Sequence, residues 1–189
     1  MLHYLLICLL MLCLYGCASL TYVEPTSGDR ARVRFVTDTS FPIILRVYDR
    51  PDCSGNEYEW MRLRNGYVVN SSPKRLGMPL WNYHENAAKE VYVAVGKPLT
   101  GIFFGYEQLS ALGVKHFYEC GVYFNVEFQN YKDYEVSFEW KRTECFVTVS
   151  EIQAQPSGTY SFLTVAKFDS KVTSANRSCL KLFKRLRLD

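Results

Sequence analysis

The chain has 189 residues, the usual size of one domain with room for an N-terminal export segment. Its 48% of hydrophobic and 22% of charged residues exclude a disordered chain, which has too few apolar groups to bury. The formal net charge is only +3, and the basic excess lies at the C-terminal end, so no nucleic-acid partner is expected. Aromatic residues, at 15%, suit the pleated surface of strands and favour an all-β fold.

An apolar run over residues 4–15 (YLLICLLMLCLY) opens the chain. It is shorter than the roughly 20 residues of a transmembrane helix and has the length of the hydrophobic region of a signal peptide. If this signal is an ordinary secretory one, Cys17 at its end is incidental. An uncleaved anchor is a third alternative.

The residues that close this run are Leu14, Tyr15, Gly16 and Cys17. This motif resembles the lipobox of bacterial lipoproteins, with leucine three residues and a small residue one residue before the modified cysteine. The resemblance implies that residues 1–16 are a cleaved signal peptide and that Cys17 is lipidated. Because Ala18 and not aspartate follows, it also implies anchoring in the outer membrane, with the body facing the periplasm. A diacylglycerol with an amide-linked acyl chain holds a protein stably on a membrane.

Residues 17–29 mix small, polar, proline and glycine residues without periodicity, which predicts a tether. Residues 30–189 then form a single domain. They show period-two patterning, which is typical of strands with one buried face. The expected strands are residues 30–36, 43–48, 90–95, 99–106, 120–128, 134–140, a strand that starts at Cys145, and residues 160–167.

Short strands joined by turns predict an antiparallel β-sandwich, for which immunoglobulin and transthyretin domains are looser analogies. Residues 90–95 and 99–106 are expected to form a hairpin around the break at Gly96. In the first strand, the arginines are expected to point to the exposed face. Residues 60–85 are interpreted as a long excursion with at most a short strand near residues 67–70. Residues 107–115 are interpreted as one helical turn or a loop.

Four cysteines lie in the body, and none forms a CxxC pair, which favours disulfides in an oxidising compartment over a zinc site. We expect Cys120 to pair with Cys145 and Cys53 with Cys179, although the sequence allows three connectivities. In a plain meander, the strands of Cys120 and Cys145 would be roughly 10 Å apart, too far for a disulfide. That bond therefore requires another strand order or a crossing between sheets.

No catalytic signature is found, and no metal or cofactor is expected. His84 and His116 are interpreted as loop or strand-end residues. Glu57 with Glu59, and Glu135 with Glu139, are acidic pairs that could suggest acid–base chemistry or Ca²⁺ binding. The second pair follows strict alternation and is interpreted as solvated charges on an exposed strand face.

Two regions are candidates for recognition. The aromatic residues Trp60, Tyr67, Trp81 and Tyr83 lie in the least regular segment and could bind a glycan or a protein, or could simply cover one open end of the core. Residues 180–188 form a basic and apolar tail. As a helix it would suit anionic lipid headgroups or an acidic partner, and as a final strand its charges would protect a sheet edge.

The lipobox, the single strand-rich domain and the spacing of Cys120, Asp133-Tyr134 and Cys145 are similar to small Gram-negative lipoproteins of no known activity. The resemblance implies a role in the cell envelope. The leading hypothesis is a non-enzymatic protein that binds or scaffolds an envelope protein or glycan through its loops. The alternative is an envelope glycan or peptidoglycan hydrolase, or an inhibitor of one, that uses Glu57, Glu59 or His84.

Overall fold

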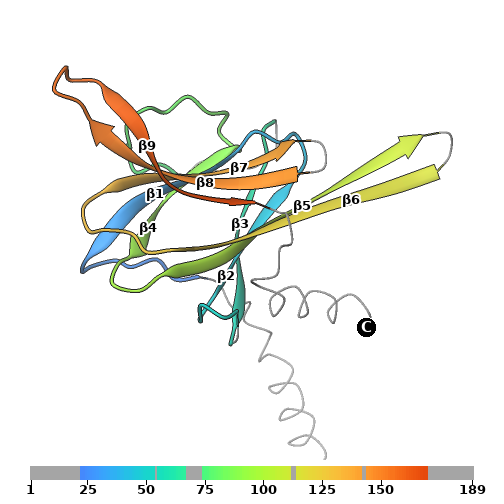
Figure 1. Ribbon diagram of the computed structural model, residues 1–189, viewed down its shortest axis with the longest axis horizontal. Coiled ribbons are helices and arrows are strands. Elements are labelled where there is room, and N and C mark those ends of the chain that lie inside the picture. The colour runs from blue at the N-terminus through green and yellow to red at the C-terminus, as the bar shows by residue number, and fades with distance from the viewer. Residues whose placement is uncertain (1–21, 54, 67–73, 112–113, 142–143, 170–189) are drawn as a thin grey trace, which may run out of the picture.

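A computed structural model describes residues 22–53, 55–66, 74–111, 114–141 and 144–169, and this part of the chain is a two-layer β-sandwich (Figure 1). The five-stranded sheet has the order β4-β1-β7-β8-β9, and the four-stranded sheet has the order β3-β2-β5-β6. The all-β sandwich expected from the alternation is therefore confirmed. The strands are β1 (Arg30–Thr37), β2 (Ile43–Tyr48), β3 (Glu57–Leu63), β4 (Ala88–Ala94), β5 (Leu99–Ala111), β6 (Val114–Val126), β7 (Asp133–Lys141), β8 (Glu144–Ala154) and β9 (Tyr160–Asp169).

One strand pair departs from the antiparallel arrangement that we expected. Strands β1 and β7 are parallel, with Arg32 opposite Asp133 and Phe35 opposite Val136. Parallel neighbours need a long crossover connection. Here the crossover is made by strands of both sheets, because the chain passes through β2 to β6 before it returns as β7.

The hairpin predicted for residues 90–95 and 99–106 is wrong. β4 pairs with β1, whereas β5 pairs with β2 and β6 in the other sheet. The turn at Gly96, whose φ is 82°, therefore carries the chain from one layer to the other. A turn in the sequence shows where a strand ends. It does not show which sheet the next strand joins, because both sheets have an apolar inner face.

Two further interpretations of the sequence are corrected. The stretch of residues 107–115, expected as a helical turn or loop, lies in the β5–β6 hairpin, whose register continues to Ala111 opposite Val114. This hairpin extends well beyond the body of the sandwich (Figure 1). Strand β3 was missed, because its pairing with β2 shifts between Leu45 and Arg46, and such a bulge interrupts the period-two pattern.

The core lies between the two sheets and is built from the inward sides of their strands. Phe35, Phe103 and Phe138 are fully buried. The rings of Phe103 and Phe138 stack across the two layers with their centroids 5.6 Å apart. The alternation in the sequence predicted the inward position of Phe35 and Phe138.

A disulfide joins Cys120 of β6 to Cys145 of β8, with the two Cα atoms 6.2 Å apart. Because β6 and β8 belong to different sheets, the bond crosses the sandwich. The predicted pair is confirmed, and of the two arrangements that the sequence left open for it, the structure has the crossing between sheets. Cys53 is buried and disulfide-bonded, and its expected partner Cys179 lies outside the described residues.

Part of the segment predicted as a tether lies against the sandwich. The ring of Tyr22 packs on Trp60 at a centroid distance of 4.1 Å. The carboxylate of Glu24 accepts a hydrogen bond from the backbone N–H of Tyr92 at 3.1 Å and pairs with Lys74. The predicted signal peptide, Cys17 and the basic tail lie outside the described residues. In the part of the chain that is described, no helix has the length and apolarity required to span a membrane.

Candidate functional site

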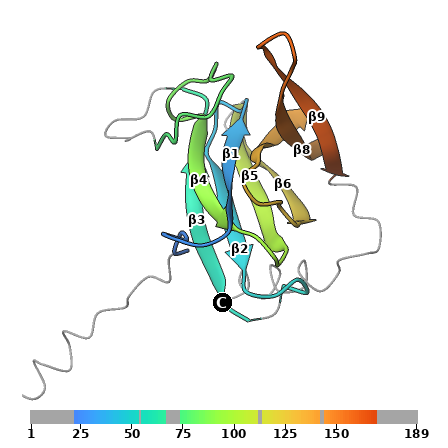
Figure 2. The same cartoon turned by 90° about the vertical axis from the view of Figure 1, so that its left-hand side faces the viewer.

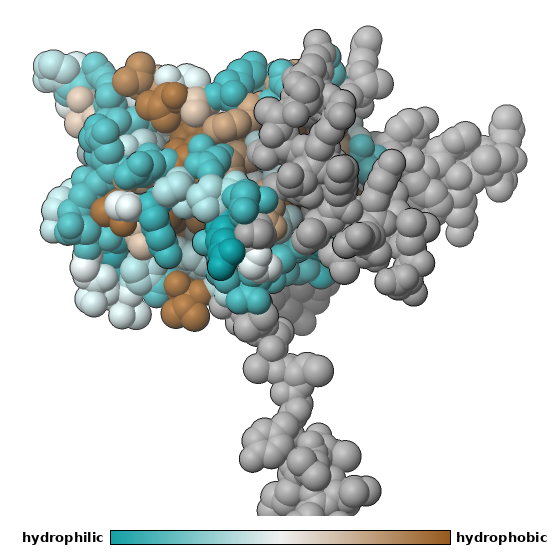
Figure 3. All heavy atoms as spheres, turned by 60° about the horizontal axis from the view of Figure 1, so that its bottom comes forward, coloured by the Kyte–Doolittle hydropathy of each residue, from teal (hydrophilic) through white to brown (hydrophobic). Residues whose placement is uncertain are grey.

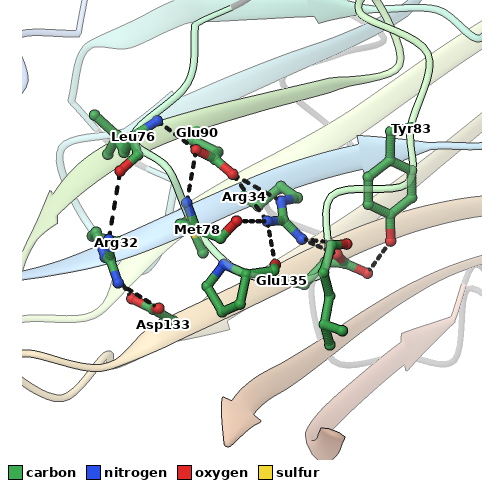
Figure 4. Close-up of polar contacts among 10 residues, drawn as sticks. Arg32, Arg34, Leu76, Met78, Tyr83, Glu90, Asp133 and Glu135 are labelled. Carbon is green, nitrogen blue, oxygen red and sulfur yellow. Dashed lines mark hydrogen bonds and ion pairs between the residues drawn. The ribbon is translucent and has the colours of Figure 1, made fainter. Parts of the chain in front are cut away.

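A buried arginine lies on the outer face of the five-stranded sheet. The alternation of β1 turns Phe35 into the core and Arg34 to the opposite face. Arg34 is nevertheless 0% exposed, so the expectation that the arginines of this strand face solvent is wrong for Arg34. The cause is residues 74–87, most of which were interpreted as part of a long excursion and which cross this face (Figure 4).

Two glutamates flank Arg34 on the neighbouring strands. The sheet register places Glu90 of β4 and Glu135 of β7 opposite it. The Nη2 of Arg34 lies 2.9 Å from Oε1 of Glu90, and its Nη1 lies 3.2 Å from Oε2 of Glu135. Glu135 is 8% exposed, so its interpretation as a solvated charge is wrong. Glu139 of the same strand pairs with Lys141 nearer the surface.

The same ionic groups hold the backbone of residues 74–87, which we call the anchored segment. Arg34 donates hydrogen bonds to three successive carbonyls, those of Met78 at 3.1 Å, Pro79 at 2.6 Å and Leu80 at 3.3 Å. The second carboxylate oxygen of Glu90 accepts from the backbone N–H groups of Leu76 and Met78. Charged groups make stronger hydrogen bonds than neutral ones, so the bonds from Arg34 and Glu90 stabilise the position of this segment on the sheet.

Two of the aromatic residues singled out in the sequence are part of this site. The Tyr83 hydroxyl donates to Oε1 of Glu135 at 2.7 Å, and the Tyr83 ring meets that of Trp81 edge-on with centroids 6.2 Å apart. The guanidinium of Arg34 lies 5.5 Å from the Trp81 ring, and that of Arg75 lies 4.1 Å from it. Trp81 and Tyr83 are half-buried, while Arg75 is exposed.

The other two aromatic residues are not part of the same group. Trp60 packs on Phe35 at a centroid distance of 5.1 Å and borders the core. Phe35 and Arg34 are adjacent on β1 and face opposite sides, so Trp60 is separated from Trp81 by the sheet. Tyr67 lies outside the described residues.

Burial shifts the pKa values of Glu135 and Tyr83 at this site. Burial is the main cause that raises the pKa of Glu135, while its bonds with Tyr83 and Arg34 oppose the shift. Burial and the bond to Glu135 raise the pKa of Tyr83 well above its usual value, which keeps the hydroxyl protonated as a donor.

The residues considered for catalysis are dispersed. Glu57 and Glu59 lie on β3 of the four-stranded sheet, paired with Arg46 at 2.7 Å and Arg62 at 2.6 Å. His84 is exposed on the anchored segment, which lies over the five-stranded sheet. Its Nδ1 accepts a hydrogen bond from the backbone N–H of Asn86. The side chain of His116 lies outside what is described, and no group of three or more potential metal ligands occurs among the described residues.

The arrangement is suited to holding the anchored segment in one conformation. Arg34 directs its donors at protein carbonyls and carboxylates, and so its positive charge is engaged within the fold. The large apolar side chain that the segment exposes is Leu80, at 39%, and the exposed Arg75 lies over the half-buried Trp81 next to it. Comparisons of the chain with protein-family models, with curated proteins and with solved structures find no match.

Proposed function

We propose that this chain is a lipid-anchored protein of the bacterial cell envelope that binds a partner through the anchored segment without catalysing a reaction. The partner class that fits best is another envelope protein. Trp and Arg are enriched among the residues that contribute most to protein–protein binding, and here Arg75 stacks on Trp81 beside the exposed Leu80.

The observation that carries the proposal is that Arg34 donates hydrogen bonds to the carbonyls of Met78, Pro79 and Leu80. A segment that is already ordered loses little conformational entropy when it binds, so more of its contact energy contributes to affinity. Leu80 has a φ of 61°, a conformation that is rare for a residue with a side chain. The Arg34 bonds support this backbone, which directs an apolar side chain outward.

The proposed location has two supports. The Cys120–Cys145 disulfide agrees with an oxidising compartment such as the periplasm. The motif Leu14-Tyr15-Gly16-Cys17 supports a lipid anchor, and Ala18 after it supports the outer membrane. A membrane-held protein needs only modest affinity for a partner in the same compartment, because confinement raises the effective concentration.

Labelling with a clickable fatty acid tests the anchor. The wild-type chain should incorporate the label and fractionate with membranes, and Cys17→Ser should abolish both. Cys13→Ser, a change in the same leader, is the matched control and should keep the label. A wild-type chain that is soluble and carries no label would rule out the anchor.

A photoreactive amino acid at position 80 tests the binding surface. The group should form a discrete crosslinked product with one envelope protein on illumination of intact cells. The same group at Tyr131, which is 86% exposed in the turn before β7, is the control and should not form that product. Arg75→Ala should weaken the crosslink without changing the melting temperature. If position 80 yields nothing in repeated trials, the binding proposal fails.

A further inference from the structure

Strand β9 forms one edge of the five-stranded sheet, and β8 is the only strand paired with it in the part of the chain that is described. Figure 2 shows β9 at the far edge from β4. An edge strand presents a row of backbone N–H and C=O groups that another extended chain can pair with. The character of this edge therefore determines what it can bind.

The opposite edge of the same sheet is closed by the chain itself. On β4, the N–H of Glu90 donates to the carbonyl of Lys74 at 2.9 Å, and the N–H of Tyr92 donates to the carboxylate of Glu24 at 3.1 Å. Segments from two other parts of the chain thus block strand addition at β4.

The β9 edge differs in composition as well. Residues 160–166 (YSFLTVA) contain no charged residue, no proline and no glycine. The described surface drawn in Figure 3 is mainly hydrophilic, with apolar side chains in local groups. Seven large hydrophobic side chains are exposed among the described residues, and four of them lie on β9: Tyr160 at 47%, Phe162 at 45%, Leu163 at 49% and Val165 at 47%. Proteins usually protect such an edge with charges or proline.

The usable part of this edge is residues 160–164. Over this stretch the register with β8 is continuous, from Tyr160 opposite Ala154 to Thr164 opposite Ser150. The register then shifts at Val165, and Lys167 and Asp169 bring charges. A bulge and charges at this end limit strand addition to the first half of β9.

We propose that residues 160–164 pair antiparallel with the same residues of a second copy of this chain, which joins the five-stranded sheets of two copies across a two-fold axis at Phe162. Only an extended strand satisfies a row of backbone groups. In a two-fold pairing each copy offers the same patch, so the patch must complement itself.

The sequence of β9 meets this requirement. With the axis at Phe162, the two Phe162 rings are opposite each other, Tyr160 is opposite Thr164, and Ser161 is opposite Leu163. Aromatic pairs and aromatic–β-branched pairs are favourable across antiparallel strands. No like charges meet, because the stretch has none. Apolar side chains would lie at the joint on both faces of the combined sheet, because Phe162 and Leu163 point to opposite faces of β9.

This dimer leaves the anchored segment accessible. That segment covers β4, β1 and β7, whereas β9 lies at the other edge of the sheet (Figure 2). The self-association therefore stands independently of the partner binding proposed above. One short strand pair buries less than the roughly 1,200–2,000 Å² of a standard interface, so a weak dimer is expected.

A charge-swap experiment on the full-length chain tests the pairing and its axis. Sedimentation of the purified protein over a range of concentrations should show a monomer–dimer equilibrium. Phe162→Lys and Phe162→Glu should each weaken the dimer at least tenfold, since each places like charges across the axis. An equal mixture of the two variants should restore dimerisation. Val23→Lys, at another exposed apolar position (84%), is the control and should dimerise like the wild type.

Several outcomes would overturn the proposal. A wild-type chain that is monomeric at all concentrations excludes it, as does a dimer that Phe162→Lys leaves intact. A photoreactive group at position 162 should crosslink two differently tagged copies of the chain. Crosslinks to another protein, or only within one chain, would show that the edge has a different occupant. Unchanged melting temperatures would confirm that the variants fold.

Discussion

Arg34 of β1 and Glu90 of β4 lie directly opposite each other, both side chains are 0% exposed, and their Nη2 and Oε1 atoms are 2.9 Å apart. Two charges removed from water lose hydration energy that their mutual attraction does not always repay. In this protein Glu90 also accepts hydrogen bonds from the backbone N–H groups of Leu76 and Met78, and Arg34 donates one to the carbonyl of Pro79. The pair therefore fixes one conformation of the anchored segment, and an apolar pair could not replace those contacts.

Replacing Arg34 by Ala should destabilise the protein by about 3–5 kcal/mol, because two carboxylates then remain buried without their cation. Arg32→Ala is the matched control. Arg32 lies two residues away on the same face, and it also makes a short ion pair, 2.7 Å from Asp133, but its side chain is 37% exposed. Exposed pairs contribute about 0–1 kcal/mol. Urea unfolding measures both, and equal losses would contradict the role given to Arg34.

The stability of the protein should depend on the ionisation of Glu135. Its folded-state pKa lies above the ordinary value of 4.5 because it is buried. Between those two values, the native state binds more protons than the unfolded state, so the unfolding free energy falls as the pH rises through this window. The contribution is fully present below the ordinary pKa and is lost above the folded-state pKa.

Glu135→Gln separates this effect from other titrations, because glutamine cannot lose a proton. The unfolding free energy of the wild type, relative to this variant, should decrease as the pH is raised above 4.5. Urea unfolding of both proteins at a series of pH values measures the difference. An increase instead would show that Arg34 holds the pKa of Glu135 below its ordinary value.

The sequence predicted the layers of the sandwich better than its outer surfaces. Alternation identified the inward side chains of β1, β6 and β7, because burial against a second sheet imposes a strict period of two. The same rule assigns every other residue to solvent, and it failed at Arg34 and Glu135. Their burial depends on the anchored segment, whose Met78 lies 44 residues from Arg34 in the chain.

A local signal could have indicated part of this site. The segment of residues 74–87 contains Gly77 and Pro79 and has no strand pattern, yet it carries Trp81 and Tyr83, which are costly to expose. Such a segment must lie on a surface, and its rings need something to cover. Which sheet face it covers could not be predicted, because the choice depends on the pairing of β1 with β4 and β7 across large sequence distances.

Removing the cross-sheet disulfide with the double change Cys120→Ala and Cys145→Ala should destabilise the domain by about 2–4 kcal/mol. The bond closes a sequence separation of 25 residues and restricts the unfolded chain. A chain without it should expose more surface on unfolding, so the denaturant m-value should rise. Urea unfolding without reductant gives both quantities. A loss of stability at constant m-value would indicate a cavity effect alone.

Gly101 on β5 allows the Phe124 ring and the backbone of β2 to approach closely. A Cβ at this position would lie 2.8 Å from the carbonyl oxygen of Arg46 and 2.8 Å from Cζ of Phe124. The carbonyl belongs to a paired strand and cannot move without disturbing the sheet. Gly101→Ala should therefore cost about 1–3 kcal/mol, in the range of overpacked cores.

Gly121→Ala on β6 is the control for this change. The nearest atom to its added Cβ would be Cδ1 of Ile102 at 3.2 Å, the end of a flexible side chain. Alanine also loses less backbone entropy than glycine on folding, by roughly 0.5–1 kcal/mol, which offsets a small clash. Gly121→Ala should thus leave the urea midpoint nearly unchanged or raise it, while Gly101→Ala lowers it. The reverse order would mean that β2 and β5 are not held as closely as the register of the four-stranded sheet requires.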